Sequence, residues 1–272
     1  MNKVGVIILT YNRIDLLKIT LCRVLNQTYK PSEILVVDNF STDGTIDYLR
    51  SVEGINTLFL GQNTGPAGGF YEGVKYFAEN TDVEFVWMMD DDFFPFMSCL
   101  ENLMQSVDKE KILFPYTREK NFVFRKEPGW WGVLVPMDII KKVGYPKKDF
   151  FFWSEDTEYL LYRIREKYNF KAQWVKPAKG VHFTERIKNH RHTWKYYYEV
   201  RNMMFMRLYV RKPTLRRYYK LMRSWLFLLG AIVVKENEKF SKLKMFLYGT
   251  WHGITKKLGK RIDPSSGKKL KL

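Results

Sequence analysis

Residues 85–92 read Phe-Val-Trp-Met-Met-Asp-Asp-Asp, an apolar run that ends in three consecutive carboxylates. The run predicts a buried β-strand, because it is rich in β-formers and contains neither Gly nor Pro. Side chains alternate along an extended chain, so Asp90 and Asp92 are expected on one side and Asp91 on the other. Two converging carboxylates at a strand end suit Mg²⁺ or Mn²⁺. A solvated acidic turn is the alternative, but the preceding buried strand favours the metal site.

The chain before this run alternates apolar strands with amphipathic helices. We expect strands over 4–10, 34–37, 55–60 and 85–89, and helices over 16–25, 43–49 and 69–78. This alternation predicts a parallel sheet with helices on both faces, and ligands bind beyond the carboxyl ends of such strands. Polar clusters stand at those ends: Thr10-Tyr11-Asn12-Arg13, Asp38-Asn39, Asn63-Thr64-Gly65 and Asp90–Asp92. Four strands that deliver polar groups to one rim predict a binding site there.

Two of these clusters allow more than one interpretation. Asp38 and Asn39 suit recognition of a nucleobase and a ribose, because a carboxylate accepts from ring N–H and hydroxyl donors. A simple turn after a strand is the alternative. The stretch 65–69, Gly-Pro-Ala-Gly-Gly, lets backbone approach a ligand closely and leads into a helix whose N-terminus favours anions. It is also compatible with a plain turn.

Composition indicates a globular chain with an unevenly placed positive charge. The 272 residues are 46% hydrophobic and 17% aromatic, enough for a large core and unlike a disordered chain. The formal charge is +17, and residues 212–272 contribute +13 of it, from 16 Lys/Arg against three acids, which leaves +4 for residues 1–211. A basic tail of this kind predicts an anionic partner, either nucleic acid or a membrane surface.

Compartment and membrane topology follow from other features of the sequence. Cys22 and Cys99, both expected in helices, provide no disulfide framework, so a reducing compartment is expected. Residues 1–3 lead straight into the first strand without a cleavage-site pattern, so no signal peptide is expected. The stretch Trp225–Val234 is about half as long as a membrane-spanning helix requires. No transmembrane segment is expected.

In order and spacing, the four polar clusters closely resemble the family 2 glycosyltransferases with the GT-A fold, over about the first 190 residues. Gly-Gly-Phe at 68–70 and the three adjacent aspartates are most similar to the bacterial galactofuranosyltransferase branch, and the rhamnosyltransferases are the nearest alternative. The resemblance implies an α/β fold, a GT-A (nucleotide-diphospho-sugar transferase) Rossmann-like mixed sheet with a C-terminal helical extension. We expect a catalytic domain over 1–192, divided into a nucleotide-sugar half (about 1–95) and an acceptor half (about 96–192). A basic amphipathic helical extension is expected over 193–272.

The resemblance also implies roles for residues of the rim. It implies that Asp38 contacts the uracil of the donor, and that Asp90 and Asp92 hold Mn²⁺ or Mg²⁺ on the donor diphosphate. Asp91 is expected to meet the sugar or to support the turn. The whole donor-binding set comprises Thr10, Tyr11, Asn12, Arg13, Asp38, Asn39, Asn63, Gly65, Gly68, Gly69, Asp90 and Asp91.

A second acidic segment supplies the expected catalytic base. Residues 150–156, Phe-Phe-Phe-Trp-Ser-Glu-Asp, are expected to run from an aromatic strand into a helix with Ser154 as N-cap. One-step displacement of UDP requires a base on the acceptor hydroxyl. A carboxylate at this position has that role in the resembling family, which implies Asp156 as base and Glu155 as its orienting neighbour. These acids and Glu158 also suit the first turn of a helix for electrostatic reasons alone, but the upstream rim favours catalysis.

Histidines and tryptophans complete the expected site. A lone His among apolar residues, such as His182 in the predicted strand 179–183, is usually structural, but the resemblance implies that it is a third metal ligand. His190 and His192 are expected to contact phosphate or acceptor, or only solvent. Adjacent side chains of a strand cannot share a face, so one of the two tryptophans at 130–131 is expected in the core. The other is free to stack on an acceptor sugar, and the sequence does not distinguish Trp130 from Trp131.

The C-terminal third is expected to be helical. Residues 194–209 are rich in aromatics and Met, and are expected to pack against the catalytic domain. Two further helices are expected to be amphipathic and basic, which suits an anionic membrane interface; docking on the core with solvated Lys is the alternative. The first has Arg216, Arg217, Lys220 and Arg223 opposite Leu221, Trp225, Leu228 and Leu229. The second has Phe240, Leu243, Leu247, Trp251 and Ile254 flanked by Lys239, Lys242, Lys256 and Lys257.

These features predict an inverting, metal-dependent hexosyltransferase in the synthesis of a cell-wall or other surface polysaccharide. The expected donor is UDP-galactofuranose and the expected acceptor a lipid-linked glycan; rhamnosyl or other hexosyl transfer is the alternative. The expected location is cytoplasmic, peripheral on the inner face of the plasma membrane. A sugar nucleotidyltransferase would carry a basic Gly-rich loop after the first strand, where Thr-Tyr-Asn-Arg stands instead. A nucleic-acid-binding protein would not explain the acidic rim, because carboxylates repel phosphates, so no nucleic acid partner is expected.

Overall fold

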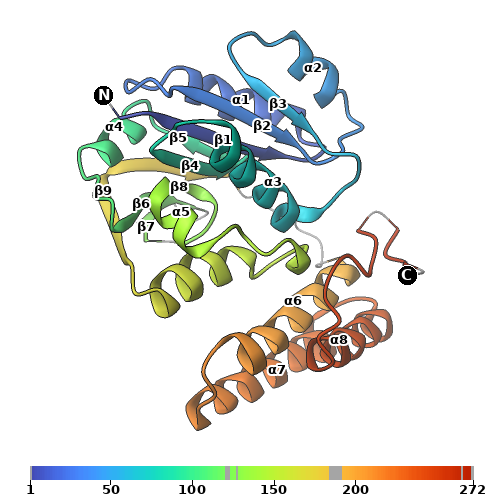
Figure 1. Cartoon of the computed structure of the whole chain (residues 1–272). Helices are drawn as coiled ribbons and strands as arrows, with labels where there is room; N and C mark the ends of the chain where they lie inside the picture. Colours follow the sequence, from blue (N-terminus) through green and yellow to red (C-terminus); the bar gives the residue numbers. More distant parts are fainter. Residues whose placement is uncertain (1, 120–122, 127, 184–191, 265, 271–272) are drawn as a thin grey trace.

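The computed structural model describes residues 2–119, 123–126, 128–183, 192–264 and 266–270. The described chain contains a nine-stranded mixed sheet of order β3-β2-β1-β4-β8-β6-β9-β5, with β7 paired to β6 (Figure 1). The strands are β1 (Val4–Thr10), β2 (Glu33–Asp38), β3 (Asn56–Phe59), β4 (Phe85–Asp90), β5 (Phe93–Pro95), β6 (Lys111–Arg118), β7 (Phe124–Arg125), β8 (Trp131–Pro136) and β9 (Lys171–His182).

The first four strands form a parallel half, as the strand–helix alternation predicts. β1 lies between β2 and β4, and β3 flanks β2. Thr10 pairs with Asp38 and Leu9 with Asp90, so these strands end at the same level. The polar residues that follow them therefore meet at one rim of the sheet.

The second half of the sheet departs from the parallel pattern. β8 runs antiparallel to β4, β6 antiparallel to β8, and the edge strand β5 antiparallel to β9. β6 and β9 are parallel to each other. The sheet is therefore mixed, as the family resemblance implies, and the uninterrupted parallel arrangement of neighbours is that of β1 to β4. In β8, Trp131 pairs with Met89, which places the start of β8 beside the acidic end of β4.

Helices cover both faces of the sheet. They are α1 (Ile14–Leu25), α2 (Thr45–Ser51), α3 (Gly65–Asn80), α4 (Cys99–Met104), α5 (Met137–Val143), the 3₁₀ turn η1 (Lys148–Phe150) and the π-helix η2 (Thr157–Lys167). α3, α5 and η2 contribute to one hydrophobic core, and α1, α2 and α4 to the other. Along β1, Ile7 and Leu9 face the first core while Val6 and Ile8 face the second, as alternation requires.

Glycines let α3 lie close to the sheet. A Cβ added at Gly69 would lie 2.2 Å from the side chain of Leu9, and one at Gly73 would lie 3.0 Å from Ile7. α3 begins at Gly65, four residues before the predicted start, and ends at Asn80. The close approach holds the N-terminus of α3 beside the carboxyl ends of β1 and β2.

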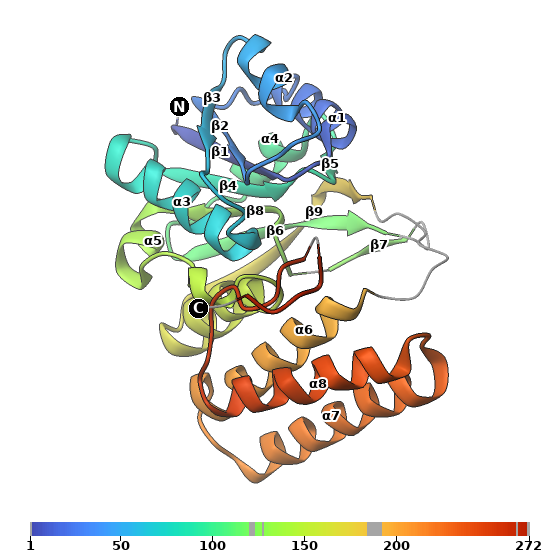
Figure 2. The ribbon, with the colours of Figure 1, turned by 90° about the vertical axis from the view of Figure 1, so that its right-hand side faces the viewer.

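The C-terminal third forms a separate helical layer, drawn in orange and red below the sheet in Figure 2. It contains α6 (Thr193–Phe205), the π-helix η3 (Met206–Val210), α7 (Leu215–Lys235) and α8 (Lys239–Ile254), which confirms the predicted helical extension. α8 lies very close to α6, because Cβ atoms added at Gly249 and Gly253 would lie 2.4 and 2.6 Å from α6 carbonyl oxygens. α7 packs on the pair through Leu221 and Ile232.

Both cysteines lie in helices, as the sequence predicts. Cys22 lies in α1 and Cys99 in α4, and both are free thiols. None of the helices in the described part of the chain combines the length and the apolarity needed to cross a bilayer.

Candidate active site

Side chains of the rim connect the ends of β1 and β2 with the start of α3. The Asn39 side-chain oxygen accepts hydrogen bonds from the backbone N–H (2.8 Å) and the hydroxyl (3.0 Å) of Thr64. The Asn12 backbone N–H donates to the Ser41 hydroxyl (2.9 Å), and its side-chain oxygen accepts from the Thr42 N–H (2.6 Å). Asn12 and Asn39 are therefore brought to the predicted rim, where their oxygens hold the loops in place.

Asp38 is fully buried at the end of β2 and has one unsatisfied oxygen. Its Oδ2 atom accepts a hydrogen bond from the Ser41 N–H at 3.0 Å, while Oδ1 has no partner in the part of the chain that the structure describes. A buried carboxylate oxygen without a donor is costly, and a ligand that supplies an N–H or O–H group would remove this cost. The observation fits the predicted contact with a nucleobase.

The start of α3 is more closely engaged with the protein than the sequence suggests. The Asn63 side-chain oxygen accepts from the Gly65 N–H (2.9 Å), and the Phe151 carbonyl accepts from the Ala67 N–H (3.3 Å). Gly65 has a φ of +69°, and a Cβ there would lie 1.9 Å from the Phe151 carbonyl oxygen. Its missing side chain makes room for the 150–156 segment.

Gly68 and Gly69 are expected from the sequence to let the backbone approach a ligand, but they too lie against atoms of the protein. A Cβ at Gly68 would lie 2.4 Å from the side chain of Thr64, and one at Gly69 would meet Leu9. The space freed at Gly65, Gly68 and Gly69 is therefore occupied by this chain's own atoms. The sequence pattern of close backbone approach is real, but the group approached at these three positions is protein.

Asp91 and Asp92 share one arginine. β4 ends at Asp90, so the next two aspartates lie in the turn to β5 and do not continue the alternation predicted for the triplet. Asp91 is buried and accepts from the Thr10 hydroxyl (2.8 Å) and from Arg13 Nη1 (3.2 Å). The same Arg13 nitrogen donates to Asp92 at 2.8 Å. Of the two roles predicted for Asp91, these contacts correspond to support of the turn.

The triplet carries more negative charge than Arg13 offsets. Burial, followed by the negative charges of Asp92, Asp91 and Glu155, raises the pKa of Asp90 well above its usual value. Burial also raises the pKa of Asp91 to about 6, against the effect of Arg13. Burial lowers the pKa of Arg13, but the attraction of the three aspartates outweighs it and the net shift is upward. A divalent cation would supply the missing positive charge.

His182 faces Asp92 across the rim. The Asp92 Oδ1 atom is buried, has no hydrogen-bond partner among the described residues and lies 3.5 Å from His182 Nε2. The other ring nitrogen of His182 lies 2.9 Å from Glu119, an arrangement that orients a metal-ligating imidazole. In the ranges that the structure describes, no three His, Cys, Asp or Glu side chains form a complete metal-binding group. The unpartnered oxygen and the facing imidazole fit a divalent cation, and the full set of Asp90, Asp92 and His182 stays a prediction.

Glu155 and Asp156 lie close enough to the aspartate triplet for Glu155 to interact electrostatically with Asp90. Glu155 is buried, and within the described ranges its Oε2 atom has no hydrogen-bond partner. Burial and the neighbouring charge of Asp156 raise the pKa of Glu155 to about 8, an effect that the backbone N–H of Glu155 partly offsets. Because Glu155 also contributes to the raised pKa of Asp90, the segments at 90–92 and 155–156 form one acidic site.

Asp156 caps the helix that follows it. Its Oδ1 atom accepts from the Thr157 backbone N–H (2.5 Å) and from the Thr157 hydroxyl (3.1 Å). Burial raises the pKa of Asp156, and these two donors oppose the shift. The helical turn nevertheless begins at Glu155, and the Glu158 N–H donates to the Ser154 carbonyl (2.8 Å), so Ser154 stands before the first turn as predicted while Asp156 supplies the side-chain hydrogen bonds. Glu158 is held by Arg163 (2.5 Å), so it stabilises the fold of η2.

The predicted strand before these acids is wrong. η1 ends at Phe150, and a γ-turn follows in which Phe151 has φ 62° and ψ −64° and the Phe152 N–H donates to the Phe150 carbonyl (2.7 Å). Trp153 and Ser154 also have positive φ, 66° and 71°. The aromatic run resembles a strand in sequence, but Phe150 and Phe151 pack into two different clusters, so the chain turns between them.

Two residues of α6 that the sequence analysis missed hold this turn. The Asn202 side-chain amide donates to the carbonyls of Phe150 (3.1 Å), Phe152 (2.8 Å) and Trp153 (2.7 Å). Arg201 is fully buried and donates to the Phe150 carbonyl at 2.6 Å. The available sequence signal was an adjacent Arg and Asn in a helix rich in aromatic residues and Met.

A family model decides the identity of the chain. The model for glycosyl transferase family 2 matches residues 5–209, which include every strand of the sheet and α6. The chain belongs to glycosyl transferase family 2.

Curated relatives of this family 2 chain are similar over part of its length. A UDP-Glc:alpha-D-GlcNAc-diphosphoundecaprenol beta-1,3-glucosyltransferase, WfaP of Escherichia coli, is 30% identical over 45% of this chain and 49% of its own. The galactofuranosyltransferase GlfT1 of Mycolicibacterium smegmatis is 33% identical over 32% and 28%. A GalNAc(5)-diNAcBac-PP-undecaprenol beta-1,3-glucosyltransferase of Campylobacter jejuni is 32% identical over 40% and 36%. The chain thus spans half or less of the length of these relatives.

Solved structures confirm the GT-A fold of the family 2 chain. TarS of S. aureus superposes with a TM-score of 0.63 at 16% identity, covering 87% of this chain and 46% of that protein. The mannosyltransferase PcManGT of Pyrobaculum calidifontis, solved with GDP-Man and Mn²⁺, has a TM-score of 0.61 at 14% identity over 94% and 88%. At these identities the similarity concerns the fold.

The two tryptophans of the family 2 chain have different environments. Trp130 is 3% exposed and stacks on Phe70, with ring centroids 4.3 Å apart, so it is the core member of the pair. Trp131 is half-buried and stacks on His182 at 4.3 Å. Trp130 is therefore the core member that the sequence left undetermined and does not have the acceptor role, whereas Trp131 borders the site through His182.

Other predicted contacts lie at the edges of the site. Tyr11 is exposed at the rim. His192 is exposed and precedes the first residue of α6, and His190 lies outside the described residues.

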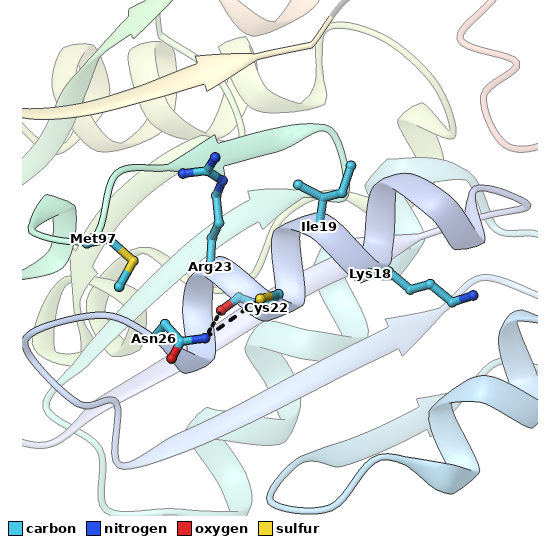
Figure 3. A pocket seen from close by; sticks show the side chains of 6 residues that line it. All are labelled: Lys18, Ile19, Cys22, Arg23, Asn26 and Met97. Atoms are coloured by element: carbon cyan, nitrogen blue, oxygen red, sulfur yellow. Dashed lines mark hydrogen bonds between the residues drawn. The ribbon is translucent and has the colours of Figure 1, made fainter.

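A separate cavity lies on the outer face of α1 (Figure 3). Its volume is about 490 Å³, and Lys18, Ile19, Cys22, Arg23, Asn26 and Met97 line it. None of the predicted site residues belongs to this lining. The cavity is therefore distinct from the acidic rim.

Proposed function

We propose that this chain is a metal-dependent, inverting glycosyltransferase that moves a sugar from a UDP-linked donor to an acceptor hydroxyl. The observation that carries the proposal is the meeting of two acidic segments, 90–92 and 155–156, at the carboxyl rim of the sheet, each with one buried carboxyl, Asp91 and Glu155. The first segment lacks positive charge and suits a cation on a diphosphate. The second supplies carboxylates of unequal basicity and suits proton transfer.

The donor would lie along the rim. Asp38 offers its unpartnered Oδ1 atom to an N–H donor of the uracil. Asp92 and His182, with Asp90 beside them, would hold Mn²⁺ or Mg²⁺. When bound, the cation would offset negative charge on the diphosphate as the bond to the sugar breaks.

Asp156 is the proposed base. Glu155, with a pKa of about 8, is mostly protonated at neutral pH and so does not accept a proton there. Burial raises the pKa of Asp156 despite the opposing hydrogen bonds from Thr157, and a raised pKa makes its carboxylate a stronger base. The acceptor oxygen forms its bond to the anomeric carbon on the face opposite UDP, Asp156 takes the hydroxyl proton, and UDP departs with the electrons of the broken bond. Attack on the face opposite the leaving group inverts the anomeric configuration.

The names of the relatives support a lipid-linked glycan acceptor and a hexose donor. Two of them are named for acceptors on undecaprenyl diphosphate, and GlfT1 is named for galactofuranose. We favour UDP-galactofuranose as donor and a role in surface or cell-wall polysaccharide synthesis. The two glucosyltransferases make UDP-glucose the competing hexose donor. An acceptor of this kind places the enzyme as a peripheral protein at the inner face of the plasma membrane.

Hydrolysis of nucleotide sugars tests this function without the acceptor. UDP-galactofuranose, UDP-glucose, UDP-GlcNAc and a dTDP-linked rhamnose are incubated with the protein in Mn²⁺, in Mg²⁺ and in chelator. We expect slow, metal-dependent release of UDP from one hexose donor. Turnover that is unchanged in chelator contradicts the metal dependence, and no binding or turnover of any donor contradicts the transferase.

A further inference from the structure

α7 is apolar on two faces, and only one of them is covered. Its inner face, which includes Leu221, Trp225 and Ile232, packs in a cluster with α6 and α8. A second set of apolar residues follows the spacing i, i+4, i+7, i+11, i+18, so its members share one face of the helix. These residues are between 52% and 89% exposed: Leu215, Tyr219, Met222, Leu226 and Val233.

Positive charge borders this outer stripe. α7 contains five Lys/Arg residues and no Asp or Glu. Arg216, Lys220 and Arg223 are exposed, whereas Arg217 is half-buried and lies 3.6 Å from Glu166. The neighbouring α8 has a further exposed apolar set beside exposed lysines at 244, 256 and 257: Phe240, Leu247, Trp251 and Ile254.

We propose that the outer stripe of α7, defined by Leu215, Tyr219, Met222, Leu226 and Val233, docks on an anionic lipid surface. Such a surface accepts both parts of the face, the aliphatic and aromatic side chains in its interfacial layer and the basic side chains at its headgroups. If a second copy of the chain docked here, the five basic residues of one α7 would face the five of the other, and α7 has no acid to offset the repulsion. Nucleic acid would leave the apolar stripe uncovered. The inference rests on the proposed function in one respect: docking would bring the active site to a lipid-linked acceptor.

Vesicle sedimentation tests the docking surface. The full chain is mixed with phosphatidylcholine vesicles that contain or lack about one third phosphatidylglycerol, at low and at moderate salt. We expect binding to the anionic vesicles, and a fall of at least tenfold in the partition coefficient for Met222→Glu/Leu226→Glu. The matched control is Ile19→Glu, which alters a residue 44% exposed on α1 and should leave binding unchanged.

The outcomes separate this surface from the proposed activity. Absence of wild-type binding to anionic vesicles, or equal binding by the double variant, overturns the docking surface. A dimer in solution that the double variant makes monomeric assigns the stripe to a second copy and also overturns it. Because donor hydrolysis needs no membrane, the double variant should retain it, and a wild-type protein that binds vesicles but hydrolyses no donor contradicts only the proposed function.

A second inference comes from the turn at 150–154. Three non-glycine residues have positive φ there, Phe151, Trp153 and Ser154, and such conformations are strained unless their surroundings hold them. The carbonyls of this turn accept hydrogen bonds from Asn202, which Arg201 orients by donating to its side-chain oxygen at 2.8 Å. The turn leads directly into Glu155 and Asp156.

We infer that Asn202 is a positioning residue that holds the turn and thereby aims Glu155 and Asp156 into the rim. The contact connects α6 in the helical layer to the acidic site across about 50 residues of sequence. Asn202→Asp keeps the shape and the bond from Arg201 but replaces the donating amide by a carboxylate, which repels the carbonyls. Its effect should therefore be local to the turn.

Two readouts test Asn202, and one needs no activity. Hydrogen exchange in peptides covering 150–158 should become faster in Asn202→Asp, and kcat should fall about 10- to 100-fold with little change in UDP affinity. The control is Tyr198→Phe, which removes a hydroxyl that donates to the Ile262 carbonyl (2.7 Å) from the same helix. Unchanged exchange at 150–158, or equal effects of the two variants, overturns the positioning role. Faster exchange in an enzyme that hydrolyses no donor supports the hold on the turn and contradicts only the proposed function.

Discussion

The two acidic segments of the site are built in different ways. Asp90–Asp92 follow a regular strand, and Arg13 and Thr10 from the neighbouring loop contact them directly. Glu155 and Asp156 follow a turn with three positive φ values that a helix about 50 residues later holds. An arginine offsets part of the charge of the first segment, whereas Glu155 in the second has a pKa of about 8 and holds a proton at neutral pH.

This difference separates positioning by local sequence from positioning by tertiary contacts. The first segment needs only β1 and β4 side by side, and the register of a parallel sheet provides this. The second depends on α3, where Gly65 leaves room for the Phe151 carbonyl, and on α6, where Asn202 donates to the carbonyls of the turn. A cation-binding role suits the rigid strand end. A proton-transfer role suits carboxyls whose pKa depends on burial.

The largest expected effect comes from Asp156→Asn in the second segment. Loss of the base should reduce kcat by roughly 10²–10⁴-fold, with UDP binding nearly unchanged. The measurement is donor turnover together with calorimetric binding of UDP in Mn²⁺. Glu155→Gln, which keeps the neutral form, is the matched control and should lose less activity. A larger loss of kcat in Glu155→Gln than in Asp156→Asn would contradict the assignment and make Glu155 the base.

A smaller effect is expected in the first segment, on cation affinity. His182→Ala removes the nitrogen that faces Asp92 Oδ1, so Mn²⁺ affinity should fall about 10- to 100-fold. Titration of Mn²⁺ in the presence of UDP measures it. His192→Ala, on an exposed residue at the start of α6, is the control. Equal Mn²⁺ affinity in His182→Ala and wild type contradicts the assignment of His182 as a ligand.

Gly65→Ala should destabilise the contact between α3 and the second segment. The new Cβ would lie 1.9 Å from the Phe151 carbonyl, and the φ of +69° disfavours any side chain. We expect a loss of several degrees in Tm, since about 1 kcal/mol corresponds to roughly 2–4 °C for a chain of this size. Gly61→Ala is the matched control, because a Cβ at Gly61 meets nothing within 4 Å. Equal Tm values for the two variants contradict the close contact.

A last effect concerns the pH dependence of stability at Glu155. Its pKa is about 8 in the folded protein against an ordinary 4.5, so folding favours the protonated form. The resulting stabilisation is complete below about pH 4.5 and is lost as the pH rises to about 8. Glu155→Gln cannot titrate, so its Tm relative to wild type should rise across this window, measured in chelator. Parallel Tm curves indicate a carboxyl with an ordinary pKa.

Much of the fold and part of the site follow from local sequence. β1, β2 and β4 are predicted because apolar runs of this length have few alternatives to a buried strand, and the rim follows from their common direction. The contact of Thr10 and Arg13 with the aspartates depends only on that rim. The helical extension is likewise readable from its periodicity.

The 150–156 segment shows where local sequence stops being informative. Three successive phenylalanines satisfy the apolar pattern of a strand, but no neighbouring strand accepts them, and η1 and a γ-turn form instead. Likewise, Trp130 and Trp131 are equivalent in sequence, and only the packing of Phe70 and His182 distinguishes them. These outcomes depend on which surfaces meet in the folded chain.

By itself, the sequence determined the parallel half of the sheet, the acidic rim at its carboxyl ends and the family of the chain. Strand direction and side-chain alternation are local properties, so a single chain segment encodes them. Only the tertiary structure decided the mixed second half, the protein contacts made at Gly65, Gly68 and Gly69, and the hold of Asn202 on the turn before Glu155. Those features arise from contacts between residues far apart in sequence, whose energies exist only after the chain has folded.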